Sequence, residues 1–552
     1  MISIQHSCCG NNYLKNNVSH NQVNFNGKKH KSMPAILEVE TPDGSVLSEV
    51  PDTPIVTKPA QLSVLHMHDF HGQSIRMERA ITISKSFDNG TLPVADSVMD
   101  KNMPTDKLKL CSGDMFRGSN PEEMTLVNEF LNLVGADALT LGNHECDSPM
   151  ANFAKKVKSH NYKIISTNIH PEKQNKMNKL KTGSFIMKIN GNKYGVIGAS
   201  PVDIMDHTKI PKEVSQLHVD DLDSTINEIR LDINEMKKHK VNKIILLSHL
   251  GIDLEQHIAQ NVNDIDLILG GHTHTMLKGV KEGENLFKSP KGEPVLIMQS
   301  GKDGQYIGIP NIRFNEFGQI IGINYNTIST DDYERSPVAK KKFDKIIKPD
   351  VLGKVDYAEK LPENLYANEN PNCDFITDCI RKELNTDIAI MNSSVTRNSF
   401  SEGNLEMRDL KSVSPFPNKV VVIKATEKEL VSTIQERSRK TMTSSNNKPG
   451  LLQVSGLKYE INQKTGDLIS LKYLNRNGKD VDIDIKHPSD KTYTVAIDDF
   501  CAKSIGEDIK NRFLHPLKVT NKTQNELVIQ SLKKQKKPVQ IKTDGRITIS
   551  KN

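Results

Sequence analysis

Short apolar runs of the length of β-strands recur between residues 61 and 300, and this repetition limits the folds that the chain can adopt. Examples are LSVLHM, LKLC, KIILLS and IDLIL, each close to the roughly 4–8 residues typical of a buried strand. Amphipathic segments with helical spacing separate several of the runs, as at residues 120–135 and 220–240. Strands that alternate with helices predict an α/β layered domain, which we expect to span residues 60–330.

A second group of strand-like runs, including DIAIMN and KVVVIKA, predicts a smaller α/β domain over residues 356–530. The 552 residues of the chain are enough for two or three domains. Between the two domains, residues 331–355 are polar and rich in Lys, and Ser336 is a candidate N-cap, which together predict a linker helix. Residues 531–552 begin with a Lys-rich segment and are predicted to form a solvated basic tail.

The first 58 residues differ in composition from the rest of the chain. Seven Asn lie between Asn11 and Asn26, and a stretch punctuated by Pro follows. Such a sequence buries too little apolar surface to fold by itself, so we interpret residues 1–58 as a mostly disordered polar leader. The alternative is an unstructured export signal of the kind that some specialised, non-Sec bacterial secretion systems accept.

Charge and hydropathy narrow the classes of partner. The net charge is only +6 and both signs are interspersed, so we expect no nucleic-acid partner. No run approaches the ~20 apolar residues of a membrane span, and no Sec signal is evident, so we expect a soluble protein without a membrane partner. It would be cytoplasmic or exported by a non-Sec route through the leader. Its seven Cys lack CxxC spacing, which favours reduced thiols.

Polar residues that are common metal ligands follow the apolar runs of the first domain, where the strands are expected to end. The carboxyl ends of parallel strands line the crevice in which ligands bind in open α/β sheets. Each residue alone has a simpler interpretation, such as a turn residue, a helix cap or a core histidine. Their joint occurrence favours a binuclear metal site with seven candidate ligands, Asp69, His71, Asp114, Asn143, His249, His272 and His274.

The donor types indicate which metals would bind. Oxygen and nitrogen donors without thiolate suit Zn²⁺, Mn²⁺ or Fe²⁺. A shared carboxylate holds two ions ~3.5–4 Å apart, a separation that serves the oxygens of one phosphoryl group, and Asp114 is our candidate for the shared ligand. His144, one residue after Asn143, has three possible roles: a ligand, a catalytic group or a core histidine.

The blocks HDFHG, GDMFRGS, GNHECD, SH and GGHTH, in this order, resemble the calcineurin-like metallophosphoesterases of the 5'-nucleotidase family. The resemblance implies a four-layer α/β/β/α metallophosphoesterase domain. It assigns the ligands to two metal sites that share Asp114. One site has Asp69, His71 and His274, and the other has Asn143, His249 and His272.

The same resemblance makes His144 and Asp147 a catalytic pair, in which the histidine stabilises charge on the scissile phosphate and the leaving oxygen. Asp147 has an alternative role as the cap of a helix that opens at Ser148. The family usually has an aromatic residue where this chain has Cys146. Asn168 matches a position that lines the phosphate pocket of the family, although an Asn at the end of a strand is often a turn residue.

The second domain resembles the 5'-nucleotidase C-terminal domain, which supplies the specificity pocket. Asn392 and Arg397 match a loop that contacts the substrate, and Phe416 matches one of two aromatic rings that hold the base. The chain departs from the family pattern at three other places. The glycines of the loop are replaced by Ser393 and Ser394, an arginine near Asn368 is missing, and the second aromatic ring has no obvious counterpart in AKSIGEDIK.

These features predict a dimetal phosphohydrolase, similar to 5'-nucleotidases, in which a metal-bound hydroxide attacks a nucleotide phosphomonoester. Alternative substrates are 2',3'-cyclic nucleotides, nucleotide sugars or other small phosphoesters. The chain is also compatible with a catalytically silent binding protein, although the complete set of ligands argues against that interpretation. The oligomeric state stays open.

Overall fold

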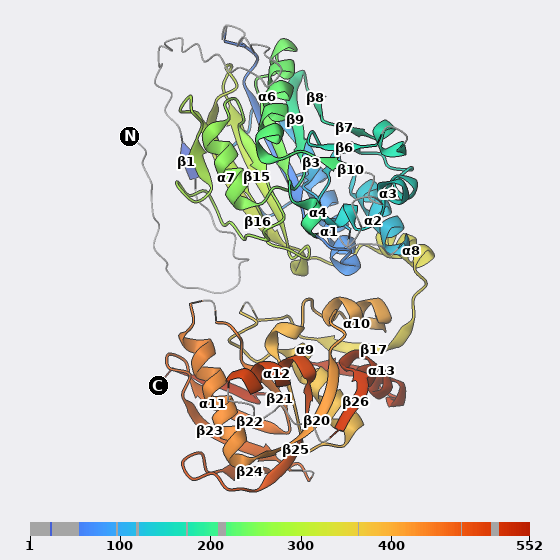
Figure 1. Cartoon of the computed structure of the whole chain (residues 1–552), viewed down its shortest axis with the longest axis vertical. Coiled ribbons are helices and arrows are strands. Elements are labelled where there is room, and N and C mark those ends of the chain that lie inside the picture. The colour runs from blue at the N-terminus through green and yellow to red at the C-terminus, as the bar shows by residue number, and fades with distance from the viewer. Residues whose placement is uncertain are drawn as a thin grey trace. The chain divides into compact units, whose positions relative to one another are not determined.

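A computed structural model describes ten segments of the chain, which are residues 22–24, 54–94, 98–116, 121–172, 175–207, 217–362, 364–445, 447–475, 477–508 and 518–551. The chain divides into two compact units, Met1–Lys348 and Pro349–Asn552 (Figure 1). Among the described residues, no helix is long and apolar enough to cross a membrane.

Two large sheets form the centre of the first unit. The strands of the first sheet are, in spatial order, β1 (Gln22–Asn24), β16 (Ile320–Ser329), β15 (Tyr306–Phe314), β2 (Ala60–Met67), β3 (Thr105–Cys111), β4 (Ala138–Thr140), β5 (Lys163–Ile165) and β7 (Lys181–Thr182). Those of the second are β13 (Leu286–Lys288), β14 (Pro294–Met298), β12 (Leu267–Leu269), β11 (Ile244–Ser248), β9 (Asn192–Ala199) and β8 (Ser184–Ile189). A small ribbon pairs β6 (Ile169–Pro171) with β10 (Leu217–Val219).

Helices cover the outer faces of both sheets. They are α1 (Ser74–Asn89), α2 (Pro121–Val134), α3 (Met150–Lys156), α4 (Ile204–His207), α6 (Leu222–Lys238), α7 (Ile252–Asn261) and α8 (Pro337–Ile346). Short 3₁₀ turns span His144–Cys146, Lys176–Lys179 and Thr330–Asp332. Helices α1, α2, α3 and α8 lie together, whereas α6 and α7 lie beside β9 and β14 of the other sheet (Figure 1).

The alternation of side chains along β2 explains the layers. Leu62 and Val64 belong to the core between the two sheets, whereas Leu65 and Met67 belong to the core under α1 and α2. A strand that is buried on both faces is apolar almost throughout, as this one is. The unit therefore has the four α/β/β/α layers that the sequence predicts.

Three sheets and five helices form the described part of the second unit. The first sheet has, in spatial order, β19 (Gly403–Glu406), β17 (Val351–Ala358) and β27 (Val539–Ile541). The second has β21 (Leu452–Ser455), β18 (Ile388–Asn392), β25 (Thr492–Asp498), β20 (Lys419–Thr426) and β26 (Lys518–Thr523). The third has β24 (Asp480–Ile483), β23 (Leu468–Leu474), β22 (Leu457–Asn462) and β28 (Ile547–Ser550). The helices of this unit are α9 (Pro371–Leu384), α10 (Met407–Val413), α11 (Glu427–Thr443), α12 (Asp499–Asp508) and α13 (Gln524–Lys534), with a 3₁₀ turn at Ser393–Val395.

Local sequence signals set the helix ends. The Ser336 side chain accepts the N–H of Ala339 and begins α8, as expected of an N-cap. The Asn370 side chain begins α9 in the same way, and α9 ends at Asn385 in the left-handed conformation. The helix predicted within residues 331–355 forms as α8. It is part of the first unit rather than a free linker, because its buried Phe343 packs into the core of that unit.

The prediction of a solvated basic tail over residues 531–552 is wrong. Helix α13 continues to Lys534, β27 pairs with β17, and β28 pairs with β22. Apolar side chains drive this packing, since Val539, Ile541 and Ile547 are all buried between the Lys-rich positions. Lys533 and Lys534 lie in the last turn of α13, where cations are favourable. Lys536 and Lys537 lie in the loop that follows.

Most of the predicted disordered leader, residues 1–21 and 25–53, lies outside the described residues. The exceptions are residues 54–58, in which the Thr57 N–H donates to the Glu316 carbonyl, and β1. The three residues of β1 pair with β16 in antiparallel register, with Val23 opposite Ile323. The leader prediction is therefore untested over most of its length.

Candidate metal centre

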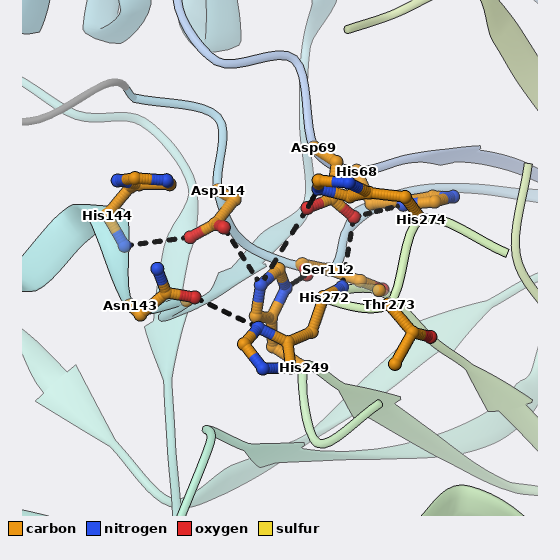
Figure 2. Close-up of polar contacts among 12 residues, drawn as sticks. His68, Asp69, Ser112, Asp114, Asn143, His144, His249, His272, Thr273 and His274 are labelled. Atoms are coloured by element: carbon orange, nitrogen blue, oxygen red, sulfur yellow. Dashed lines mark hydrogen bonds and ion pairs between the residues drawn. The ribbon is translucent and has the colours of Figure 1, made fainter. Parts of the chain in front are cut away.

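Seven residues predicted as ligands come together at the ends of strands in the first unit, and we call them the metal centre: Asp69, His71, Asp114, Asn143, His249, His272 and His274. Figure 2 labels all of them except His71. Strands β2, β3 and β4 are parallel neighbours, so the loops that follow them share one edge of the first sheet. Strands β11 and β12 are parallel neighbours in the second sheet and carry the remaining histidines. The convergence follows from strand direction, as the sequence pattern predicts.

The backbone at the centre adopts unusual conformations. Asp69, His71, Asp114, His272 and His274 all have positive φ, between 48° and 75°. Residues with a side chain rarely occupy this left-handed region, and they persist there only where the surrounding structure fixes them. The fold thus places these side chains at the expense of local strain, which is typical of a functional site.

One group of candidate ligands surrounds Asp69. Its Oδ1 lies 3.6 Å from His71 Nε2 and 3.3 Å from His274 Nε2. A second group surrounds Asp114, whose Oδ2 lies 3.2 Å from His249 Nε2. Asp114 Oδ2 is also 3.6 Å from His71 Nε2, so this carboxylate lies between the two groups.

The second group is completed by an amide and another imidazole. Asn143 Oδ1 lies 3.0 Å from His272 Nδ1 (Figure 2). The ligand atoms of Asp114, His249 and His272 are all within 4.8 Å of one another, as are those of Asp69, His71 and His274.

The spacing of these atoms fits bound metal ions. Two ligand atoms at about 2.1 Å from one tetrahedral ion lie about 3.4 Å apart, and the nitrogen–oxygen separations around Asp69 and Asp114 are 3.2–3.6 Å. Within the described part of the chain, buried Asp69 Oδ1 and His249 Nε2 have no hydrogen-bond partner. Buried polar atoms are rarely left so, and coordination to a metal would satisfy both.

Charge also favours cations here. Burial would lower the pKa of His71, but the carboxylates of Asp114 and Asp303 outweigh it and raise the pKa to about 10. Burial opposes the shift at His249 too, where Asp114 and Asp69 raise the pKa to about 10. Burial alone would raise the pKa of Asp114, yet His249 holds it well below its usual range. The carboxylates therefore stay ionised and attract positive charge.

A second layer of residues orients the candidate ligands. The backbone N–H of Ser300 donates to His68 Nε2 at 2.7 Å, so the proton of the neutral ring is on Nδ1. His68 Nδ1 donates in turn to Asp69 Oδ2 at 2.6 Å (Figure 2). On the other side, Asp303 Oδ1 lies 3.2 Å from His71 Nδ1. Such partners fix the tautomer and direction of metal ligands.

The loop that carries Asp114 is held by Glu145, which is completely buried. Glu145 Oε2 accepts the backbone N–H groups of Asp114 at 2.9 Å and Gly142 at 2.7 Å, and Oε1 accepts that of Met115 at 2.9 Å. Burial and the nearby Asp114 charge raise the pKa of Glu145 to about 7. Sequence reasoning missed His68, which is adjacent to a predicted ligand, and Glu145, which is adjacent to the predicted catalytic His144. Asp303 has no motif that would have pointed to it.

The predicted catalytic pair is formed. His144 Nδ1 lies 2.6 Å from Asp147 Oδ2, and this bond raises the pKa of His144. Asp147 does not cap the next helix, because α3 begins after Pro149 without a side-chain cap. The departure at Cys146 faces the core, where its side chain is buried.

Asn168 is fully buried, and internal hydrogen bonds occupy most of the donors and acceptors of its side-chain amide. Its Oδ1 accepts the Ser166 hydroxyl and the Ser200 N–H, and its Nδ2 donates to the Ser200 carbonyl. The geometry fits the structural alternative and gives no support to the predicted contact with phosphate.

The three predicted substrate residues belong to the second unit. The Arg397 guanidinium lies over the Phe416 ring, 5.1 Å from its centroid. Asn392 Oδ1 accepts the Ser394 N–H and begins the 3₁₀ turn that replaces the glycines of the family loop. Thr396, in the same loop, is buried and accepts a hydrogen bond from Asn370. The structure thus joins Arg397 to Phe416 and gives Asn392 a role within its own loop.

Two family models match successive parts of the chain. The calcineurin-like phosphoesterase model matches residues 62–276, and the 5'-nucleotidase C-terminal domain model matches residues 351–509. The chain belongs to the 5'-nucleotidase family. The first match includes all seven residues of the metal centre, and membership of the calcineurin-like phosphoesterases implies bound divalent metal ions.

Relatives of this 5'-nucleotidase family member differ in length. The trifunctional nucleotide phosphoesterase protein of Bacillus subtilis is 25% identical over 538 residues, which is 88% of this chain but only 35% of that protein. The NAD 5'-nucleotidase of Haemophilus influenzae is 24% identical over 505 residues, 77% of this chain and 82% of the relative. The crystal structure of a 5'-nucleotidase precursor from Thermus thermophilus is 20% identical, with a TM-score of 0.50 over 89% of this chain and 99% of that one. This likeness supports the two-domain fold.

Proposed function

We propose that this chain is a dimetal phosphohydrolase that hydrolyses nucleotide phosphomonoesters, in the manner of a 5'-nucleotidase. The observation that carries the proposal is the position of Asp114. Its Oδ2 lies within 3.6 Å of the imidazoles of His71 and His249, which belong to different groups of the metal centre. A carboxylate so placed can bridge two ions. The family assignment supports the same activity.

The metal centre would hold the two ions as two overlapping sets of ligands. Asp69, His71 and His274 form one set, Asn143, His249 and His272 form the other, and Asp114 belongs to both. The donors are oxygen and nitrogen only, which suits Zn²⁺, Mn²⁺ or Fe²⁺. When bound, two such ions activate water as a nucleophile and neutralise charge on the phosphoryl group.

The chain itself supplies a polar group beside that chemistry. His144 is 34% exposed at its side chain, so it is accessible to a ligand. Its backbone N–H donates to Asp114 Oδ1 at 2.8 Å, which ties its position to the bridging carboxylate. Because Nδ1 is bonded to Asp147, the other ring nitrogen is the one that can donate to a phosphoryl or leaving oxygen. We assign His144 and Asp147 to this role.

Recognition of the nucleoside is assigned to Arg397 and Phe416, with Asn392 shaping the loop. Phe416 is half-buried, and the guanidinium that stacks on it leaves a base only part of the ring. This observation favours a second candidate class, in which the guanidinium binds an additional anionic or sugar group, as in a nucleotide sugar or a cyclic nucleotide. The relatives above are likewise a trifunctional nucleotide phosphoesterase and an NAD 5'-nucleotidase, so their names are not limited to nucleoside monophosphates.

A screen for phosphate release separates these substrates. Purified protein, stripped with chelator and reloaded with Mn²⁺ or Zn²⁺, would be offered nucleoside 5'-monophosphates, 2',3'-cyclic nucleotides, nucleotide sugars and sugar phosphates. Nucleotide-sugar and cyclic substrates need a coupled phosphatase to reveal the product. The proposal predicts that nucleoside 5'-monophosphates rank first. If none of these substrates is hydrolysed with either metal, the proposed phosphohydrolase activity is refuted and a catalytically silent binding protein is favoured.

A further inference from the structure

Three carboxylates in the second unit face one another, in a cluster separate from the metal centre. Glu369 precedes α9, Asp374 lies in the first turn of α9, and Asp544 lies in the loop between β27 and β28. One oxygen from each lies within 4.8 Å of the others. Residues that are 170 positions apart in sequence are thus brought together by the C-terminal segment that the sequence suggested was a free tail.

Asp374 is the unusual member of the cluster. It is 1% exposed, and within the described residues neither of its carboxylate oxygens has a hydrogen-bond partner. The nearest guanidinium nitrogen, Arg546 Nε, is 3.6 Å from Oδ1, beyond hydrogen-bonding distance. Burial of a carboxylate without hydrogen bonds is strongly unfavourable, so another group is expected to satisfy these oxygens.

The other two carboxylates cannot turn away from Asp374. Glu369 Oε1 accepts the N–H groups of Asp544 and Gly545, and Oε2 accepts that of Ile547. The Asp544 carboxylate is held by two hydrogen bonds from Arg546, at 2.8 and 2.7 Å. Both groups are therefore fixed with one side toward the cluster.

The cluster carries excess negative charge. Arg546 also pairs with Asp378 at 2.9 Å, so one guanidinium faces three carboxylates, those of Asp374, Asp378 and Asp544. The carboxylate of Glu369 adds a fourth negative group beside Asp374. Burial raises the pKa of Asp374 to about 9; the Arg546 charge opposes this shift, and Glu369 and Asp544 add to it. Positive charge in some form, either a proton or a cation, is therefore required beside Asp374 at neutral pH.

We propose that Glu369, Asp374 and Asp544 bind a divalent cation of the hard, oxygen-preferring kind, with Ca²⁺ as the best fit. All donors are carboxylate oxygens, the type that Ca²⁺ and Mg²⁺ select. Mg²⁺ usually keeps several waters and is bound through one or two carboxylates, so a set of three carboxylates favours Ca²⁺. Because the three oxygens lie within 4.8 Å of one another, all three can reach one ion. The Asp544 side chain is 51% exposed, which gives the ion a route from solvent and room for water ligands.

Such an ion would link α9 to the β27–β28 loop and would stabilise the second unit. It would bind without a part in the chemistry of the metal centre, so its failure would leave the proposed function untouched.

The test is calcium stoichiometry on the full chain, with the metal centre kept saturated with Mn²⁺. Equilibrium dialysis against CaCl₂ followed by elemental analysis should find one Ca²⁺ per wild-type chain and none in Asp374→Asn, which keeps the shape and removes the charge. Asp482→Asn, at an 84% exposed position, is the matched control and should bind as wild type does. Calcium should also raise the Tm of wild type by several degrees and leave that of Asp374→Asn unchanged.

Equal calcium uptake by wild type and Asp374→Asn would overturn the proposal, and so would no uptake by wild type. In the second case a proton satisfies Asp374. If Asp374→Asn does not fold, Asp544→Asn at the exposed edge replaces it as the variant that lacks a ligand, with the same expected loss of calcium.

Discussion

His144 and Asp147 are joined by a hydrogen bond of 2.6 Å between Nδ1 and Oδ2, and the pair is attached through the His144 N–H to the carboxylate of Asp114. The pair is thus part of one hydrogen-bonded assembly with Asp114, the proposed bridging ligand. His144 also lies with His71 and Asp114 in a further group of possible ligand atoms, and we assign it to the chemistry rather than to either set of ligands.

This arrangement predicts that His144→Ala lowers kcat while both metal ions stay bound. General acid and charge-stabilising groups typically contribute roughly 100- to 10,000-fold to a rate. Asp147→Asn should lower kcat less, because the imidazole remains and only its orientation is weakened. Phosphate release and metal content would be measured on the same samples, with the exposed His487→Ala as control. Loss of metal in His144→Ala would instead make this residue a ligand.

His68 is expected to act through Asp69 on metal affinity. The ring bridges the Ser300 N–H and the Asp69 carboxylate, so it fixes the direction of that ligand. Loss of such an outer partner typically costs 10- to 100-fold in affinity. His68→Ala should therefore release metal to a competing chelator at a correspondingly lower chelator concentration, and His68→Asn, which can donate and accept, should recover part of the loss. An unchanged chelator titration would show that His68 only packs.

Phe416→Ala should change the ranking of substrates. Stacking of a base on an aromatic ring is worth ~1–3 kcal/mol, which corresponds to a loss of roughly 5- to 200-fold in kcat/KM for nucleotides. A generic aryl phosphate has no base to stack and should be hydrolysed at nearly the wild-type rate. Phe317→Ala, at an exposed position of the first unit, provides the control. The same order and spread of nucleotide substrates in Phe416→Ala and wild type would refute the stacking role.

Removal of residues 539–552 should destabilise the second unit. The deletion takes away β27 and β28, leaves β17 and β22 each with an unpaired edge, and removes three N–H donors from Glu369. Thermal unfolding followed by circular dichroism should show a lower Tm, whereas deletion of residues 551–552 alone should have little effect. A shortened chain as stable as the full one would restore the interpretation of these residues as a tail.

The metal centre could be predicted from sequence because its signals are local. Each candidate ligand directly follows an apolar strand, and parallel strands place their ends together whatever the details of packing. Asp147 was ambiguous, since a pair with His144 and a helix cap use the same local sequence. Only the actual start of α3 at Met150 separates the two roles.

Other features depend on contacts between distant segments, which the sequence pattern does not encode. Ser300 and Asp303 reach His68 and His71 across more than two hundred residues. Asn168 matched a family position, but its hydrogen bonds to Ser200 could not be read from that match. The C-terminal strands were missed for a related reason, because two short apolar runs between lysines become strands only when β17 and β22 offer them an edge.

The central claim is that Asp114 bridges two ions that together hydrolyse a phosphomonoester, and the most direct measurement is phosphate release from a nucleoside 5'-monophosphate over a series of Mn²⁺ concentrations. Wild type should be inactive after chelator treatment and should recover as Mn²⁺ is added. Asp114→Asn keeps the shape of the side chain but loses the charge, so it should stay inactive at every concentration. Turnover by Asp114→Asn close to that of wild type, or wild-type turnover that persists without metal, would contradict the account.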